Sequence, residues 1–349
     1  LGNAQMGLKL FNEAAKSYRR ALEISPHKFD VRSKLMLCLS RVCNWDELDI
    51  EKEHISEQFH NYPLGSEAPN PWAWLGIFDD PTLHKNISTA NAEKYLASRP
   101  DLGPINRPDP SKKIRIGYFS ADFHDHPTTN LLVSLLENHD RSKFEVHAFS
   151  FGPDRDMEIR NRVVNGVDHF HKVASKTDLE IAQLSRELKI DIAVDINGHT
   201  ANKRSGIFTY RAAPVQVNYL GFTSTMGTDD MDYIIADEIV IPKEQQCNFT
   251  EKTAYMPLCY MSNDNDKPIS SPGLSRQECN LPKDAFVFCC FNNSFKITSD
   301  VFKIWMRLMQ KVDNSVLWLF HTNTDVDAQL KKYAEESGID GKRIIFAPR

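Results

Sequence analysis

From residue 113 onward, the sequence alternates between short apolar segments with the two-residue period of a strand and amphipathic segments of helical length. Strands that alternate with helices at this spacing form βαβ crossovers and a parallel sheet. The less regular stretch 241–282 divides the pattern in two, so we expect two α/β lobes with a cleft between them. The predicted strands are 114–119, 144–150, 170–173, 190–195, 214–219, 232–236, 285–291, 315–320 and 343–346, and the predicted helices are 130–138, 157–165, 179–188, 300–311 and 326–338.

The N-terminal residues resemble a tetratricopeptide repeat, which is a helical hairpin of about 34 residues. Small residues let the two helices approach closely, while an aromatic residue fills the groove between them. One repeat cannot bury its own apolar face, so either further repeats precede Leu1 or this hairpin packs against the helices after it. An ordinary amphipathic hairpin is the alternative. The residues that fit one register of the repeat are Leu1-Gly2, Ala14, Tyr18, Ala21 and Pro26.

These patterns predict the domain organisation. We expect tetratricopeptide-like helices over 1–59, a proline-rich linker over 60–112 with one short helix at 89–98, and a first α/β lobe over 113–240. A connecting region over 241–282 and the start of a second α/β lobe over 283–349 follow. The chain begins inside a helical pattern without Met and stops just after a strand. We therefore expect a fragment of a longer protein, truncated at both ends.

Composition argues against several classes of function. The net charge is -5 and no basic run stands out, so we expect no nucleic-acid partner. No segment approaches the roughly 20 apolar residues of a membrane span, and no signal peptide is recognisable. The seven cysteines are scattered without metal-ligand spacing and favour reduced thiols. We expect no membrane partner and a cytoplasmic location.

Polar residues concentrate in three loops that follow predicted strands, where ligands bind in open α/β sheets. His126 comes just before Pro127, which suits the first turn of a helix. Asp195, with Asn197, His199 and Thr200, follows the strand 190–195 and suits acid/base or hydroxyl-binding roles. The third loop holds Asn293 and Lys296, and a lysine beside a helix N-terminus is suited to binding phosphate. Ordinary loop and turn chemistry is the alternative in each case.

Two common kinds of site are not indicated. Neither α/β part has a Gly-x-Gly-x-x-Gly turn or a Walker lysine loop, so a standard dinucleotide or P-loop site is not expected. Two histidine pairs, His124 with His126 and His169 with His171, stand two residues apart. Without a third ligand they do not predict a metal site, and we expect no metal.

Five longer motifs occur in order along the chain. They are Tyr118-Phe119-Ser120-Ala121-Asp122-Phe123-x-x-His126-Pro127, Asp195-Ile196-Asn197-Gly198-His199-Thr200, Arg211-Ala212-Ala213-Pro214-Val215-Gln216-Val217-Asn218-Tyr219-Leu220-Gly221, Met231-Asp232-Tyr233-Ile234-Ile235-Ala236-Asp237 and Phe291-Asn292-Asn293-x-x-Lys296-Ile297. This series resembles the O-linked N-acetylglucosamine transferase family, including its bacterial SPINDLY-like members. The resemblance extends from residue 113 to 349 nearly continuously, and tetratricopeptide repeats ahead of the catalytic region are also that family's layout.

The resemblance implies a GT-B glycosyltransferase with two Rossmann-like lobes. Such an enzyme inverts the configuration at the anomeric carbon of the transferred sugar, and it needs no metal or other cofactor. It implies transfer of N-acetylglucosamine from UDP-N-acetylglucosamine to serine or threonine hydroxyls. His126 matches the family's proton acceptor, and Lys296 matches the lysine that contacts the donor diphosphate. Asn293 stands where relatives often have Gln beside the nucleotide. His199 stands where many relatives have Tyr, so we expect it to line the site and not to act as the base.

The sequence leaves two alternative functions open and predicts an incomplete second lobe. A SPINDLY-type protein O-fucosyltransferase that uses GDP-fucose is a related alternative, although His126-Pro127-Thr128 favours the first reading. A non-catalytic scaffold whose repeat helices bind protein partners is a different class of alternative. The family's second lobe extends well beyond residue 349, so the second lobe is expected to be incomplete and this fragment inactive alone. In the enzyme reading the partners are protein acceptors, bound through the repeat helices, and a nucleotide sugar.

Overall fold

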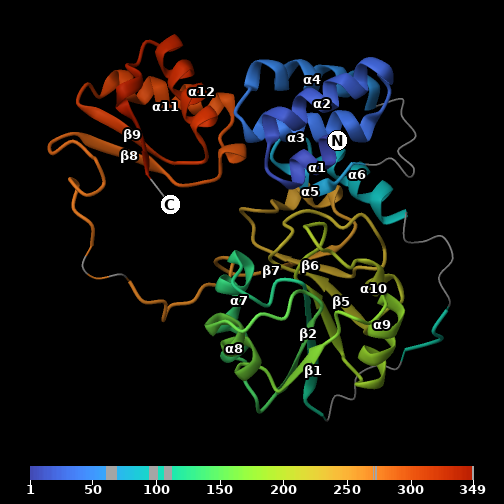
Figure 1. Cartoon of the computed structure of the whole chain (residues 1–349). Coiled ribbons are helices and arrows are strands. Elements are labelled where there is room, and N and C mark those ends of the chain that lie inside the picture. The colour runs from blue at the N-terminus through green and yellow to red at the C-terminus, as the bar shows by residue number, and fades with distance from the viewer. Residues whose placement is uncertain (60–68, 94–100, 106–111, 270, 272, 348–349) are drawn as a thin grey trace. The chain divides into compact units, whose positions relative to one another are not determined.

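The computed structural model describes residues 1–59, 69–93, 101–105, 112–269, 271 and 273–347. It divides into two compact units (Figure 1). The smaller unit comprises Leu1–Pro63 and Ile269–Arg349, and the larger unit comprises Leu64–Pro268. Every strand predicted from the sequence is present, with its ends within two residues of the prediction.

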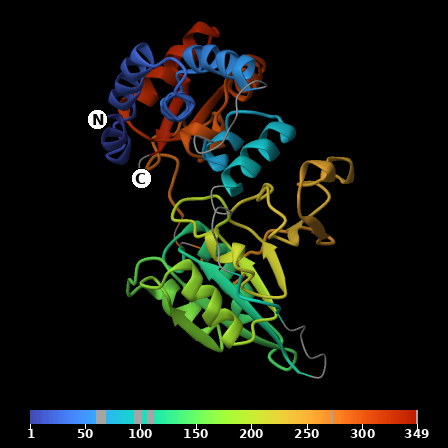
Figure 2. The same cartoon turned by 90° about the vertical axis from the view of Figure 1, so that its right-hand side faces the viewer.

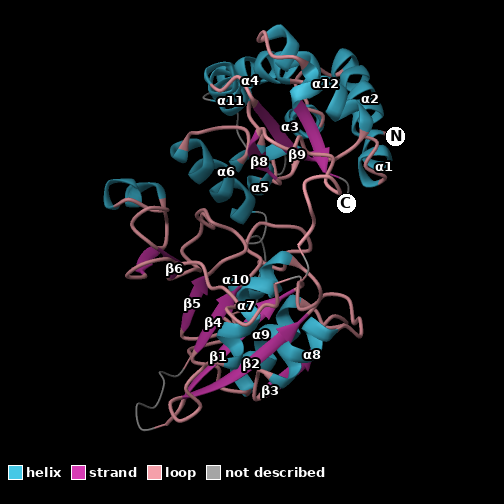
Figure 3. Cartoon of the chain, turned by 90° about the vertical axis from the view of Figure 1, so that its left-hand side faces the viewer, coloured by secondary structure: helices cyan, strands magenta, loops and turns pink. Residues whose placement is uncertain are grey.

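The larger unit is built on a parallel sheet of seven strands (Figure 3). Its strand order, β3-β2-β1-β4-β5-β6-β7, begins as in a doubly wound Rossmann sheet. The direction of winding reverses between β1 and β4, and ligands bind outside the carboxyl ends of the strands at such a reversal. The strands are β1 (Ile114–Ser120), β2 (Phe144–Ser150), β3 (His169–Lys172), β4 (Ile192–Asp195), β5 (Val215–Asn218), β6 (Tyr233–Ala236) and β7 (Lys252–Tyr255).

Alternate residues of these strands feed two apolar cores, one on each face of the sheet. Helices α7 (Pro127–Glu137) and α8 (Glu158–Asn165) pack through residues such as Leu132 against one face. Helices α9 (Asp178–Glu187) and α10 (Gly206–Thr209) cover the other face. On that second face the rings of Phe119 and Phe149 stack with their centroids 4.3 Å apart. The two-residue period of the strands therefore produces the layered α/β lobe that the sequence predicts.

The predicted linker and connecting region contain more structure than the sequence indicated. Within 60–112 lie α5 (Pro71–Leu75) and α6 (Pro81–Glu93), so the short helix expected at 89–98 in fact starts earlier. Trp74 of α5 is fully buried and stacks on Phe78. The region 241–282 supplies η2 (Lys243–Asn248) and the edge strand β7 of the large sheet. An edge strand needs few buried side chains, which is why Lys252–Tyr255 lacked an apolar signal. The rest of the predicted linker lies partly outside the described residues.

The smaller unit begins with two helical hairpins, as the repeat pattern predicts. They are α1 (Gly2–Gly7) with α2 (Phe11–Ile24), and α3 (Phe29–Arg41) with α4 (Trp45–Phe59). A Cβ added at Gly2 would lie 2.8 Å from the ring of Tyr18, so only glycine allows this close approach. Ala14 and Tyr18 are buried between the helices. These contacts confirm the roles that the repeat register assigned to the small residues and to the tyrosine.

The same unit contains a parallel sheet of three strands in the order β10-β9-β8. The chain runs through β8 (Phe286–Cys290), η3 (Ser294–Lys296), α11 (Ser299–Lys311), β9 (Ser315–Phe320), α12 (Thr324–Glu336), η4 (Gly341–Arg343) and β10 (Ile344–Ala347). The repeat helices pack against this sheet and its helices (Figure 2). The Trp45 ring stacks on Tyr333 at 4.7 Å and contacts Phe302 at 5.3 Å. Regions that the sequence placed at opposite ends of the chain therefore share one compact unit.

Among the described residues, no helix is both long enough and apolar enough to span a lipid bilayer.

Candidate functional site

His126 occupies the turn between β1 and α7, at the carboxyl end of the sheet. Its backbone is extended, with φ -144° and ψ 145°, and Pro127 begins the helix as expected. The imidazole Nδ1 accepts a hydrogen bond of 3.3 Å from the backbone N–H of Thr128 and so caps the helix. The side chain is 39% exposed. A histidine of this kind is fixed through one nitrogen and remains open to solvent.

The carboxylate of Asp122 lies on the inner side of His126. Its Oδ2 atom is 3.7 Å from the imidazole Nδ1, and Asp122 itself is buried. While Nδ1 accepts the Thr128 hydrogen bond, the neutral ring carries its proton on Nε2. In the other tautomer Nδ1–H faces Asp122, and Nε2 is free to accept a proton. The arrangement suits a histidine that gains a proton or orients a donor group.

Asn197 joins the ends of β1 and β4 at the point where the winding reverses. Its Oδ1 atom accepts hydrogen bonds from Ala121 N at 2.8 Å and from Ser120 Oγ at 3.2 Å. Its Nδ2 atom donates to Asp122 Oδ2 at 2.7 Å. Asn197 is fully buried. One amide therefore fixes the carboxylate beside His126, and the first two polar loops meet as the sequence predicted.

Asp195 ends β4 and turns the chain into the second loop. Its Oδ1 atom accepts hydrogen bonds from Asn197 N at 2.9 Å and Gly198 N at 3.0 Å. Gly198 has φ +53°, and a Cβ there would lie 2.4 Å from Phe222 Cβ, so the turn requires glycine. Burial raises the pKa of Asp195 to about 6, against the opposing effect of these two N–H donors. Asp195 therefore shapes the loop and carries a perturbed carboxyl group.

His199 is buried with both ring nitrogens engaged. Nε2 lies 3.1 Å from the carbonyl oxygen of Met226 and must donate to it. Nδ1 is then the acceptor for the Lys203 ammonium at 3.0 Å. His199 thus has no nitrogen free to take a proton from a substrate, which agrees with the expectation that it is not the base. Thr200 donates from Oγ1 to Asn197 O at 2.8 Å and closes the turn.

The third and fourth sequence motifs have a mainly structural role. Arg211 donates to both carboxylate oxygens of Asp232, at 2.6 and 2.7 Å. Gln216 is fully buried, accepts from Ala212 N at 2.8 Å and donates to Phe208 O at 2.9 Å. These bonds hold the starts of β5 and β6 together. None of these three polar side chains is thereby placed among the loops that hold His126 and Asn197.

The Lys296 loop, in the smaller unit, is held by the repeat helices. Ser294 Oγ donates to the carbonyl oxygen of Arg41 at 2.8 Å. The indole N–H of Trp45 donates to the carbonyl oxygen of Ile297 at 3.1 Å. The Arg41 guanidinium lies 4.3 Å from the centre of the Phe295 ring. The backbone on both sides of Lys296 is therefore tied to the end of α3 and the start of α4.

The side chains of Asn293 and Lys296 are exposed on this fixed loop. Lys296 makes no ion pair with any residue in the described part of the chain. Thr298 caps α11 by accepting a hydrogen bond from Val301 N at 3.3 Å. A free ammonium group beside a helix N-terminus suits an anionic ligand, as the sequence predicted. That this loop meets the His126 loop stays a prediction.

Sequence reasoning assigned no role to three side chains near the site. Asp122 belongs to a motif that was recognised, so its place beside His126 was within reach of the sequence. Lys203 is four residues after His199 and gave no other signal. Glu251 is buried, and burial raises its pKa while it accepts a 2.7 Å hydrogen bond from Thr225 Oγ1 and one of 2.6 Å from Met226 N. It supports the segment that contacts His199, and no local pattern marks it.

Comparison with known proteins agrees with this geometry. The model of "Glycosyl transferase family 41" matches residues 96–271 and 266–349, which is well over half of the chain. The chain belongs to glycosyl transferase family 41. The structure also resembles that of the Thermobaculum terrenum O-GlcNAc transferase mutant, with a TM-score of 0.78 and 25% identity. That alignment covers 100% of this chain and 66% of the other. The α/β GT-B fold predicted from the sequence is confirmed.

Two plant proteins are similar in sequence to this family 41 chain over most of its length. An Arabidopsis thaliana protein named "Probable UDP-N-acetylglucosamine--peptide N-acetylglucosaminyltransferase SEC" is 31% identical over 332 residues, covering 89% of this chain. A second Arabidopsis thaliana protein, named "Probable UDP-N-acetylglucosamine--peptide N-acetylglucosaminyltransferase SPINDLY", is 32% identical over 254 residues, covering 70% of this chain. The chain spans only 34% and 27% of these two relatives.

Proposed function

We propose that the whole protein transfers N-acetylglucosamine from UDP-N-acetylglucosamine to serine and threonine hydroxyls of other proteins. Membership of family 41, over residues 96–349, is the observation that carries this proposal. The relatives' names give the same donor and a peptide acceptor. The donor is a substrate, and the proposed reaction uses no cofactor. All seven cysteines are free thiols, which supports a reducing, cytoplasmic location.

In this proposal Lys296 acts on the donor. The glycosidic bond to the diphosphate breaks as the sugar is transferred, and the leaving diphosphate gains negative charge. A fixed ammonium group stabilises that charge more in the transition state than in the ground state. Asn293, three residues earlier and exposed on the same loop, is placed to contact the nucleotide. The anchoring of this loop by Trp45 and Ser294 supports a role that requires a fixed position.

His126 acts on the acceptor side in the same proposal. Its Nε2 atom accepts the proton of the attacking hydroxyl in the tautomer whose Nδ1–H faces Asp122, 3.7 Å away, or it donates a hydrogen bond that orients the acceptor in the other tautomer. Asn197 and Asp195 hold this arrangement at the carboxyl ends of the strands, while His199 and Thr200 line the acceptor site. Protein acceptors are proposed to reach the site with help from the repeat helices.

Label transfer by the full-length protein tests the proposal. The protein is incubated with a cell extract and either labelled UDP-N-acetylglucosamine or labelled GDP-fucose. We expect protein labelling from the first donor only. Labelling from GDP-fucose alone would assign the protein to O-fucose transfer instead. Labelling from neither donor would contradict an enzymatic role and would favour a binding scaffold built on the repeat helices.

The role of His126 is tested with His126→Asn in the full-length protein. Asn still caps α7, so the fold is retained, but it cannot take up a proton. We expect kcat to fall by about 10²- to 10⁴-fold. Loss of the acidic limb of the pH–rate profile would indicate proton acceptance, whereas a parallel drop at all pH values would indicate positioning. His124→Asn, two residues away on the same loop, is the matched control and should keep normal turnover.

A further inference from the structure

Four ionisable side chains share one face of the sheet at its β3 edge. Glu145 and His147 come from β2, and His169 and His171 come from β3. Because side chains two residues apart in a strand point to the same face, each strand contributes a pair. The strands are parallel with His147 beside His169, which brings the two pairs together. The sequence showed only the pair on β3, and the β2 neighbour supplies the ligands that this pair lacked.

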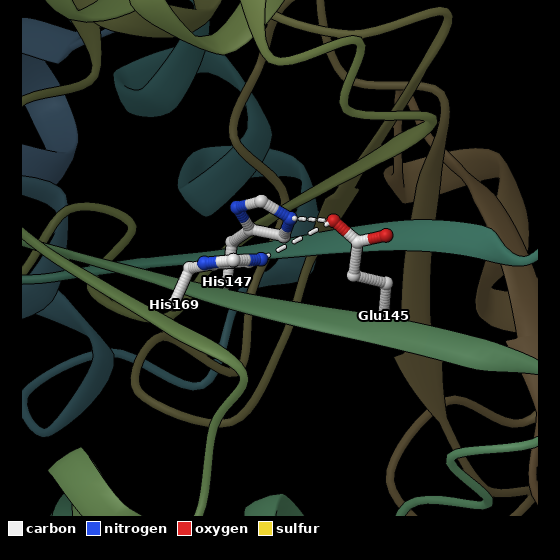
Figure 4. Close-up of side chains that lie close together, drawn as sticks. All are labelled: Glu145, His147 and His169. Carbon is white, nitrogen blue, oxygen red and sulfur yellow. Dashed lines mark hydrogen bonds and ion pairs between the residues drawn. The ribbon is translucent and has the colours of Figure 1, made fainter.

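The ligand atoms have the spacing of a metal site. Glu145 Oε1 lies 3.0 Å from His147 Nε2 and 3.4 Å from His169 Nε2 (Figure 4). The three ligand atoms all lie within 4.8 Å of one another. Zinc bonds of about 2.0–2.1 Å in a tetrahedron separate neighbouring ligand atoms by about 3.3 Å. Two of the three separations already match, so an ion needs only small movements of the side chains.

Neighbouring groups orient two of the three ligands. His147 Nδ1 lies 3.1 Å from His171 Nε2, which leaves Nε2 of His147 directed at Glu145. Arg115 Nε lies 3.4 Å from Glu145 Oε2, which leaves Oε1 directed at the two imidazoles. Such partners fix the rotamers and the ring tautomer of metal ligands in known sites. Within the described part of the chain, the Arg115 guanidinium forms an ion pair with this carboxylate, and it engages the oxygen that the ion does not need.

Solvent can reach the cluster from one side. The His169 side chain is 51% exposed and that of Glu145 is 28% exposed, whereas His147 is 3% exposed. An ion therefore has an entry path, and a water molecule has room to complete a fourth position. Imidazole combined with carboxylate is a ligand set that suits zinc better than magnesium or calcium.

We propose that Glu145, His147 and His169 bind one Zn²⁺ ion that joins the edge strand β3 to β2. The role is structural, because His147 lies three residues before the end of β2 at Ser150, away from the strand ends that carry Asp122 and Asn197. β3 is a four-residue edge strand, paired on one side only within the sheet, and an ion that bridges it to β2 stabilises its attachment. This proposal is independent of the proposed transfer activity.

Metal titration of the chelator-treated protein tests the proposal. ZnCl₂ binding is measured by calorimetry, and Co²⁺ is added separately because tetrahedral Co²⁺ absorbs visible light strongly. We expect one ion per chain, tetrahedral Co²⁺ bands, and at least tenfold weaker binding in His169→Ala. Since His169 is exposed, this variant should fold normally, as circular dichroism will verify. His27→Ala is the matched control. It removes an exposed histidine from the turn between α2 and α3, and it should bind the metal as tightly as the parent protein does.

His171→Phe adds a test of the supporting contact. It keeps an aromatic ring against Phe149 but removes the partner of His147 Nδ1, so we expect about 10- to 100-fold weaker binding. Unchanged affinity in His169→Ala, an equal loss in His27→Ala, or a parent protein without tetrahedral Co²⁺ bands would each overturn the proposal.

Discussion

In the larger unit the loop after β4 is fixed by its own buried side chains, whereas in the smaller unit the loop after β8 is fixed through its backbone by other helices. Asn197 engages both atoms of its amide group, and Asp195 engages one carboxylate oxygen, with neighbouring loop atoms. The Lys296 loop instead presents its carbonyl groups to Trp45 and Cys43, and its ammonium group stays exposed.

This difference separates two ways of organising a reactive group. A histidine that handles a proton gains from a carboxylate in a fixed position, and a buried amide provides that. A lysine that binds a diphosphate must keep its ammonium group unpaired, so the neighbouring helices bind the loop backbone and not the lysine side chain. The comparison predicts that substitutions in the first loop alter stability, while substitution of Lys296 alters only activity.

Among the substitutions that test this comparison of the two loops, Lys296→Met should have the largest effect and should act on catalysis alone. We expect kcat of the full-length protein to fall by about 10²- to 10³-fold, equivalent to about 3–4 kcal/mol of transition-state stabilisation. Because the side chain is exposed, the free energy of unfolding should change by less than about 0.5 kcal/mol. Lys303→Met, another exposed lysine on the adjoining α11, is the control. Normal turnover in Lys296→Met would remove this lysine from the mechanism.

Asp195 should make stability depend on pH in the acidic range. Its pKa is about 6 in the folded protein, raised by burial from 3.8, so the folded state binds the proton more tightly than the unfolded state. Its contribution to stability is therefore largest below about pH 4 and is lost as the pH rises through 6. The loss is on the order of 3 kcal/mol. Urea titrations of the parent and of Asp195→Asn should differ by that change between pH 4 and 7, and identical pH dependence would contradict it.

Asn197→Ala should destabilise the larger unit by about 2 kcal/mol. The change leaves the N–H of Ala121 buried without its acceptor and removes the donor that holds Asp122. The measurement is the urea midpoint monitored by circular dichroism. Asn161→Ala, on the exposed surface of α8, is the matched control and should lie within about 0.5 kcal/mol of the parent. An equal effect of the two substitutions would show that the buried amide does not organise the loop.

Trp45→Phe should have the smallest effect, about 1 kcal/mol on stability. Phe keeps an aromatic ring against Tyr333 but loses the N–H that Ile297 O accepts. In the full-length enzyme we expect a higher KM for the donor with kcat nearly unchanged, because the Lys296 loop becomes less fixed. Trp305→Phe on α11 is the control. A kcat loss as large as that of Lys296→Met would contradict a purely positioning role for Trp45.

The sequence by itself determined the local elements and the ends of the strands. Runs rich in apolar residues placed β1, β2 and β9 within a residue of their bounds, since parallel strands buried on both faces are apolar over most of their length. Pro127 after His126 indicated the first turn of α7 correctly, because proline suits only the first turn, although the predicted helix 130–138 began three residues late. The small residues at Gly2 and Ala14 predicted the helix hairpin. The family motifs marked His126, Asp195 and Lys296 as candidates without saying how they are held.

Only the tertiary structure decided which distant segments support one another. The pairing of Trp45 with Ile297 joins residues 252 positions apart, and no local pattern encodes it. The edge strand β7, helix α5 and the first part of α6 escaped detection because short or peripheral elements bury few side chains. The cluster of Glu145, His147 and His169 depends on the register between β2 and β3. A one-residue shift would turn one pair to the other face, so spatial register, and not composition, created it.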